Sequence, residues 1–208
     1  MKIDSIVKPL RIIDPESWVI HDTRLPNEFC DMILDHFAEL PDRAATAKNA
    51  KGHRRCGMRW DDQTSWIGPF LWQYIQEVNE RIFQYDLSSA FASEIHQLEY
   101  RPGHYYHWHR DDMVECRLQY APPHFTSVRQ QTTEYVRKLS FSLQLSDEDE
   151  YTGGDLQILP ENNDKVITVP KKRGTLVIFD SRTRHRIKPV KSGKRFVLVG
   201  WVVGPRWK

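Results

Sequence analysis

Residues 101–112, with the sequence RPGHYYHWHRDD, bring several metal-binding side chains together at short spacing. Side chains two residues apart point to the same face of a β-strand, so His107, His109 and Asp111 are expected to share one face. An imidazole and a carboxylate that converge in this way can chelate a metal ion. The pattern alone is weak evidence, because nine histidines in 208 residues make chance pairs common. It predicts a metal site only if a third ligand comes from elsewhere in the fold.

His185 is the strongest candidate for that third ligand. It follows a strongly apolar run in GTLVIFDSRTRHRIKPV and stands at the entrance of the next predicted strand. Two histidines and one carboxylate with open positions are typical of non-haem Fe(II) oxygenases. Zinc could bind the same groups with a water molecule, so residue types leave the metal open. A cupin-type site would use His107 and His109 together, but positions 113–114 hold Met and Val where that site needs glutamate.

Composition and charge narrow the classes of function. The net charge of +2 gives no electrostatic reason to expect nucleic-acid or membrane binding. No apolar run approaches the roughly 18 residues that span a bilayer, and the first residues lack the apolar core of a signal peptide. The three cysteines show no C-x-x-C spacing, which argues against a disulfide framework or a zinc knot. We therefore expect a cytoplasmic protein.

Two helices are predicted in the first half of the chain. Apolar residues recur every three to four positions in 25–40 and in 65–85. Between them, residues 41–60 are small, polar and basic without a period, and we expect a mobile loop there. The basic segment 41–59 and the irregular segment 113–134 are candidate lids over a site, since loops of such length are usually functional or disordered.

From residue 93 onward the pattern changes to short β-type runs separated by turn residues. Many short strands without intervening helices favour an antiparallel sandwich or barrel over a parallel sheet. We expect one domain over 1–208, in which 1–92 give helical support and 93–204 form the β core. The predicted strands are 93–101, 104–111, 136–145, 155–159, 165–169, 174–179, 185–190 and 195–203.

Four segments of this β half match a known family. They are YRPGHYYHWHRD (100–111), RKLSFSLQLSDEDEYTGGDLQI (137–158), GTLVIFDSRTRHRIKPV (174–190) and SGKRFVLVGWVVG (192–204). In this order and number they resemble the 2-oxoglutarate- and Fe(II)-dependent dioxygenases, in their prolyl 4-hydroxylase-like branch. The resemblance implies a double-stranded β-helix, or jelly-roll barrel, backed by N-terminal helices.

The resemblance also implies roles for single residues. His109, Asp111 and His185 take the positions of the Fe(II) ligands. Arg195, ten residues after His185, takes the position of the cation that pairs with the far carboxylate of 2-oxoglutarate. Arginine suits this role because its planar fork of N–H donors matches a carboxylate.

Four further positions carry weaker implications. Tyr100 and Ser140 match residues that help to hold 2-oxoglutarate, and Tyr106 and Trp201 match aromatic residues near the substrate pocket. Tyr106 has the wrong parity to share a face with His109 on a regular strand. The family assigns no role to His107. Its role therefore stays open, and it could either support the metal ligands or contact the substrate.

The implied activity is hydroxylation of an unactivated C–H bond, with Fe(II) as cofactor, 2-oxoglutarate and O2 as co-substrates and ascorbate as a candidate reductant. The acceptor would be a peptidyl proline or a similar protein side chain. A small molecule or free amino acid is an alternative acceptor. Nucleic acid is another, although Trp201 occupies the position where demethylases of the superfamily carry a second arginine. A non-enzymatic metal-binding domain is the remaining alternative.

Overall fold

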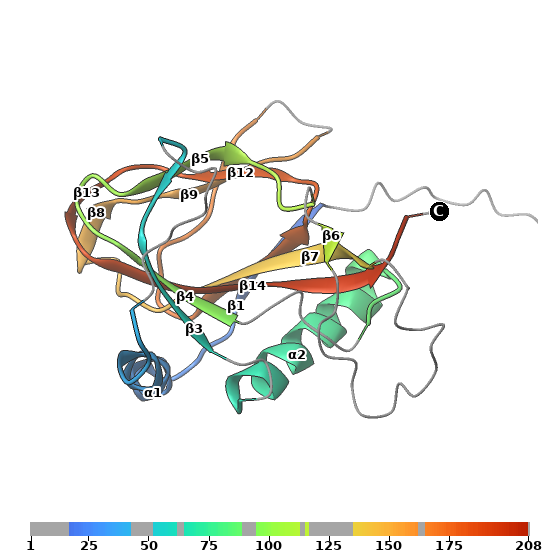
Figure 1. The fold of residues 1–208 in the computed structure, drawn as a ribbon, viewed down its shortest axis with the longest axis horizontal. Helices are drawn as coiled ribbons and strands as arrows, with labels where there is room; N and C mark the ends of the chain where they lie inside the picture. The colour runs from blue at the N-terminus through green and yellow to red at the C-terminus, as the bar shows by residue number, and fades with distance from the viewer. Residues whose placement is uncertain are drawn as a thin grey trace, which may run out of the picture.

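The computed structural model describes residues 17–42, 52–61, 65–88, 95–112, 115–116, 135–161 and 165–207. Two antiparallel sheets face one another in it (Figure 1). The predicted fold, a mainly β jelly roll with flanking helices, is confirmed. The larger sheet has the order β1 (Trp18–Asp22), β11 (Thr175–Asp180), β7 (Tyr135–Gln144), β14 (Arg195–Pro205), β4 (Ile95–Tyr100) and β3 (Gly57–Asp61), and β6 (Glu115–Cys116) also pairs with β7.

The smaller sheet carries the His-x-Asp segment at the end of one of its strands. Its order is β10 (Ile167–Thr168), β9 (Leu156–Leu159), β12 (Arg184–Ile187), β5 (Tyr105–His109) and β2 (Arg54–Arg55). A separate pair, β8 (Tyr151–Gly153) and β13 (Val190–Gly193), lies at one end of both sheets (Figure 1).

Two helices, α1 (Asn27–Ala38) and α2 (Ile67–Val78), lie against the larger sheet on the side away from the smaller one (Figure 1). Both helix predictions are confirmed. Pro26 precedes α1, where its fixed φ suits the start of a helix, and a π-helical turn, η2 (Asn79–Phe83), extends α2. No helix within the described residues is both long enough and apolar enough to cross a bilayer.

The two faces of the larger sheet are buried in different ways. On β14, Leu198 packs with the helices, whereas Val197 packs between the two sheets. This follows from the alternation of side chains along a strand. Because both faces are covered, β4, β11 and most of β7 are buried at every position.

The N-terminal half contributes strands as well as helices, which the sequence analysis did not predict. Residues 54–55 and 57–61 fall in the segment that we expected to be a loop, but they pair with β5 and β4. Strand partners from the second half thus override the weak local pattern. The remaining candidate lid residues, 43–51 and most of 113–134, lie outside the described residues.

Candidate metal centre

His109, Asp111 and His185 converge on one point between the sheets. β5 and β12 are neighbours, and His109 lies directly opposite His185. The candidate ligand atoms of the three residues all lie within 4.8 Å of one another. The Nε2 atoms of His109 and His185 are 3.7 and 3.4 Å from the two Asp111 carboxylate oxygens. Within the described part of the chain, no other group of three or more His, Cys, Asp or Glu side chains is so placed.

The other ring nitrogen of each histidine is held by the backbone. His109 Nδ1 lies 2.7 Å from the His107 carbonyl oxygen, and His185 Nδ1 lies 3.1 Å from that of Thr183. A carbonyl can only accept, so each Nδ1 carries the proton and each Nε2 presents a lone pair. Two lone pairs therefore face a carboxylate with no proton between them. Such an arrangement is favourable around a divalent cation, and the donor set fits Fe(II).

The Asp111 carboxylate is oriented by several neighbours. Ser140 donates a hydrogen bond of 2.8 Å to Asp111 Oδ2, and the Ser140 and Ser181 hydroxyls are 3.0 Å apart. Burial raises the pKa of Asp111, but the two imidazoles, Arg137 and a hydrogen bond from Trp201 together hold it below its usual value. The sequence led us to expect Ser140 beside 2-oxoglutarate, and the structure instead places its hydroxyl on Asp111.

Burial also acts on the imidazole of His109. Burial and the neighbouring His185 lower the pKa of His109 to about 3, so the His109 ring is neutral near pH 7. An ionised carboxylate and a neutral imidazole are the protonation states that metal binding requires.

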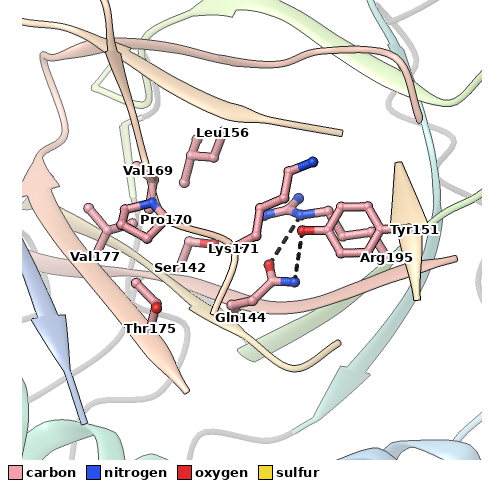
Figure 2. Close-up of a pocket in the computed structure, with 10 residues that line it drawn as sticks. All are labelled: Ser142, Gln144, Tyr151, Leu156, Val169, Pro170, Lys171, Thr175, Val177 and Arg195. Carbon is pink, nitrogen blue, oxygen red and sulfur yellow. Dashed lines mark hydrogen bonds between the residues drawn. The ribbon is translucent and has the colours of Figure 1, made fainter. Parts of the chain in front are cut away.

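Arg195 is the first residue of β14 and lies opposite Tyr100 on β4. Its side chain is only 3% exposed. Its Nε donates to Gln144 Oε1 at 3.2 Å, whereas its Nη1 has no hydrogen-bond partner among the described residues. Gln144 in turn donates to the Tyr151 hydroxyl at 3.0 Å (Figure 2). The buried guanidinium thus keeps an unused donor, which a carboxylate could accept.

Gln144 was not predicted, although the sequence contains a signal for it. Ser140, Ser142 and Gln144 alternate with apolar residues over 139–144, so they share the face between the sheets. Two pockets meet on this face. One contains the metal-ligand candidates, the other contains Arg195 and Gln144 (Figure 2), and both are lined by Ser142 and Leu156. A single molecule could therefore extend from the triad to Arg195.

The two predicted aromatic residues lie beside the triad. The Tyr106 ring stacks on His109 with centroids 3.5 Å apart, and Trp201 carries the Arg137 guanidinium 3.8 Å above its ring. Tyr106 reaches the same pocket as His109 because the pairing of β5 with β12 shifts register between His185 and Ile187. Such a bulge changes which side chains share a face.

His107 does not share the ligand face, contrary to our expectation for a regular strand. Its side chain is exposed and lies near His53 and Tyr105, with ring centroids 5.9 and 4.7 Å away. Its contribution to the site is the backbone carbonyl that holds His109.

Comparisons with known proteins agree with this geometry. Residues 95–203 match the family model of the 2OG-Fe(II) oxygenase superfamily. A PKHD-type hydroxylase of Synechococcus elongatus is 31% identical over 145 residues, which cover 67% of this chain and 57% of the relative's length. A PKHD-type hydroxylase of Hyphomonas neptunium is 47% identical over 64 residues, or 31% of this chain and 28% of the relative. The chain thus matches little more than half of the first relative and less of the second.

Two solved structures share the fold at low sequence identity. A prolyl-4-hydroxylase of Pseudomonas putida superposes with a TM-score of 0.64 at 19% identity, covering 92% of this chain and 94% of that one. A Trichoplax adhaerens prolyl hydroxylase in complex with a hypoxia inducible factor peptide fragment has a TM-score of 0.65 at 17% identity, covering 90% and 84%.

Proposed function

The chain belongs to the 2OG-Fe(II) oxygenase superfamily, and on this premise we propose that it hydroxylates an unactivated C–H bond at the expense of 2-oxoglutarate and O2. The observation that carries the proposal is the convergence of two imidazole lone pairs and one carboxylate next to a pocket that ends at a buried arginine. His109, Asp111 and His185 would hold Fe(II). When bound, the metal supplies O2 activation coupled to decarboxylation of 2-oxoglutarate to succinate and CO2.

The protein's own part is to fix the ligands before any substrate arrives. The His107 and Thr183 carbonyls set the tautomer of both imidazoles, and Ser140 restrains the carboxylate. Rotation of a ligand out of place would break one of these hydrogen bonds, so the metal site is preorganised.

Arg195 would bind the far carboxylate of 2-oxoglutarate. Its Nη1 has no hydrogen-bond partner among the described residues and could donate to that carboxylate, and Gln144 holds its Nε so that the fork keeps one orientation. Tyr100 lies opposite on β4, with its ring 5.6 Å from the guanidinium carbon, and forms part of the same wall. The guanidinium of Arg195 is almost fully buried, and removal from bulk water strengthens a charge-assisted hydrogen bond.

For the acceptor we propose a peptidyl proline or a similar protein side chain. The support is the likeness to prolyl hydroxylase structures, one of which holds a peptide. Tyr106 and Trp201 would bound the space for the acceptor beside the metal. We further propose ascorbate as the reductant and the cytoplasm as the location, where the buried thiols of Cys30 and Cys56 would stay reduced.

The metal assignment can be tested without knowing the acceptor. Anaerobic addition of Fe(II) and 2-oxoglutarate should produce a weak visible charge-transfer band, which His109→Ala and Asp111→Ala should abolish. His107→Ala is the matched control, because the site uses only its carbonyl, and it should keep the band. A normal band in His109→Ala would refute the triad.

The acceptor class needs a second experiment. Proline-containing peptides should release succinate in step with the gain of one oxygen atom in the peptide, measured by mass spectrometry. Peptides that stay unmodified while nucleic acid or a free amino acid reacts would overturn the peptidyl acceptor.

A further inference from the structure

The pocket walls hold more positive charge than the proposed reaction with a neutral peptide requires. Two arginines line the adjoining pockets, Arg54 and Arg195, and neither forms an ion pair with a carboxylate among the described residues. Lys171, which also lines the wall, pairs with Asp155 at 3.0 Å. Two other half-buried arginines, Arg182 and Arg173, do pair with a carboxylate, that of Asp180 and that of Asp31.

Arg54 in particular has only weak acceptors around it. Its Nε points to Cys56 Sγ at 3.1 Å and its Nη2 to Met58 Sδ at 3.9 Å, while its guanidinium carbon lies 5.0 Å from the centre of the Tyr106 ring. Thiol and thioether sulfur are poor hydrogen-bond acceptors, and a guanidinium has five N–H donors to satisfy. A group that stays charged at any physiological pH is thus half-buried without an oxygen acceptor in the described residues.

The place of Arg54 separates it from the 2-oxoglutarate arginine. Arg54 lies on β2 opposite Tyr106 of β5, and Tyr106 stacks on the ligand candidate His109. It lines the pocket that also contains the metal ligands and Trp201, whereas Arg195 lines the adjoining pocket beyond Ser142 and Leu156. Arg54 therefore lines the pocket that also holds Tyr106 and Trp201, the two side chains proposed to bound the space for the acceptor.

Charge balance points to the nature of that acceptor. Divalent Fe(II) and dianionic 2-oxoglutarate would offset each other. Asp111 is the one carboxylate among the described residues that line the two pockets, and the guanidinium of Arg137 lies beside it, so Arg54 is left without a counter-charge. An uncompensated charge in a partly desolvated wall is costly, and a bound anion would remove this cost.

We propose that Arg54 binds a carboxylate of the acceptor substrate, so that the hydroxylated group carries a carboxylate close to its reacting C–H bond. The inference rests on the proposed hydroxylation and narrows the acceptor to one that carries a carboxylate. The carboxylate belongs to the C-terminus of a peptide, to an Asp or Glu beside the reacting residue, or to a free amino acid or similar small acid, which would replace the peptidyl acceptor proposed above. All three offer the same planar group to the guanidinium fork.

The test measures binding, not turnover. The protein is loaded with Mn(II) and N-oxalylglycine, an unreactive analogue of 2-oxoglutarate, so that the Arg195 pocket is filled. Calorimetry then compares matched acid and amide probes: L-proline with L-prolinamide, Ala-Ala-Pro with its C-terminal amide, and Ala-Pro-Asp-Ala with Ala-Pro-Asn-Ala, both blocked at their termini. The pair with the largest preference for the acid identifies the source of the carboxylate.

We expect the wild type to bind at least one acid about tenfold or more tightly than its amide, as a charge-assisted hydrogen bond implies. Arg54→Met should reduce this preference to near unity and Arg54→Lys should restore part of it. Arg55→Met, a change of the exposed neighbour on the same strand, should leave the preference intact. Arg54→Met and Arg54→Lys should both bind N-oxalylglycine as the wild type does, which also shows that the variants are folded.

Three results would overturn the inference: acids and amides that bind equally to the wild type or not at all, a preference that survives in Arg54→Met, or a loss of N-oxalylglycine binding in an Arg54 variant whose circular dichroism matches that of the wild type. The last result would assign Arg54 to the co-substrate. Failure of the wild type to bind Mn(II) and N-oxalylglycine would instead refute the proposed function itself.

Discussion

At the scale of single residues, the site depends on which atoms are already occupied by protein contacts. Backbone carbonyls occupy Nδ1 of His109 and of His185, so only the Nε2 lone pairs remain for a metal. Arg195 shows the opposite situation, because its Nη1 is buried and has no partner in the described residues. A buried donor without a partner lowers the folding stability of the ligand-free protein, and binding of a ligand that accepts its hydrogen bond restores that stability.

The substitution Arg195→Met separates the contribution of Arg195 to ligand binding from its cost to the stability of the ligand-free protein. We expect 2-oxoglutarate to bind about tenfold or more weakly, because the charge-assisted hydrogen bonds are lost. The free energy of unfolding of the ligand-free protein should stay unchanged or rise by about 1–2 kcal/mol, because an unpaired buried cation has been removed. Titration of the charge-transfer band and urea unfolding measure the two quantities.

Arg186→Met is the control for this substitution. Arg186 donates to Gln157 at 2.8 Å on the outer part of β12, and its loss should leave 2-oxoglutarate affinity unchanged. Wild-type affinity in the Arg195→Met variant would contradict the assigned role.

At the scale of elements, the turn between β11 and β12 supports two of the three ligand candidates. The Ser181 carbonyl accepts from the Asp111 backbone N–H at 2.8 Å, and the Thr183 carbonyl accepts from His185. The turn itself is held by Asp180, which is 4% exposed and accepts hydrogen bonds from the Tyr85 hydroxyl at 2.6 Å and from Arg182. Asp180, which lies outside the metal centre, thus holds the turn that positions Asp111 and His185.

Asp180→Asn should weaken both the fold and the metal site. We expect the free energy of unfolding to fall by about 2 kcal/mol, because the ion pair between Asp180 and the partly exposed Arg182 is lost. Metal affinity should fall roughly tenfold, as is usual when a group that orients the ligands is removed. Denaturant unfolding and metal titration by calorimetry test the two expectations.

Tyr85→Phe provides the comparison, because it removes a single hydrogen bond from the same carboxylate and leaves the turn in place. It should cost about 1 kcal/mol of stability and should not change metal affinity. Unaltered metal binding in Asp180→Asn would show that the turn does not position the ligands.

At the scale of the whole molecule, enclosure between two sheets changes how buried groups titrate. His96 on β4 is 9% exposed and stacks on Trp60, with ring centroids 5.4 Å apart, and it contacts Trp201. Burial, reinforced by the charges of Arg54 and Arg137, lowers the pKa of His96 to about 3. Folding therefore keeps this ring neutral while the unfolded chain protonates it near pH 6.5.

The consequence is a loss of stability on acidification. Between pH 6.5 and the folded pKa of about 3, the unfolded state binds a proton that the folded state rejects, so stability falls as the pH falls. His96→Phe should remove about 1 kcal/mol per pH unit from this slope between pH 6 and pH 5. Urea unfolding of both proteins with a metal chelator present measures it, and parallel slopes would exclude the effect.

The sequence by itself determined the features that depend on local periodicity and spacing. Alternating apolar runs predicted the β core, the three-to-four spacing predicted both helices, and the positions of His109, Asp111, His185 and Arg195 within matching segments indicated the site. These features can be read from the sequence alone because each depends on residues that are close together in the chain or on a fixed order of strands.

Only the tertiary structure decided how these residues meet. Arg54 enters the pocket wall and 57–61 become an edge strand because β5 and β4 offer them unpaired backbone groups. A register shift between β5 and β12 brings Tyr106 into the pocket, and His107 stays exposed. Such outcomes depend on pairing between strands far apart in the chain, and a shift of one residue in that pairing exchanges the two faces. The local sequence therefore does not contain them.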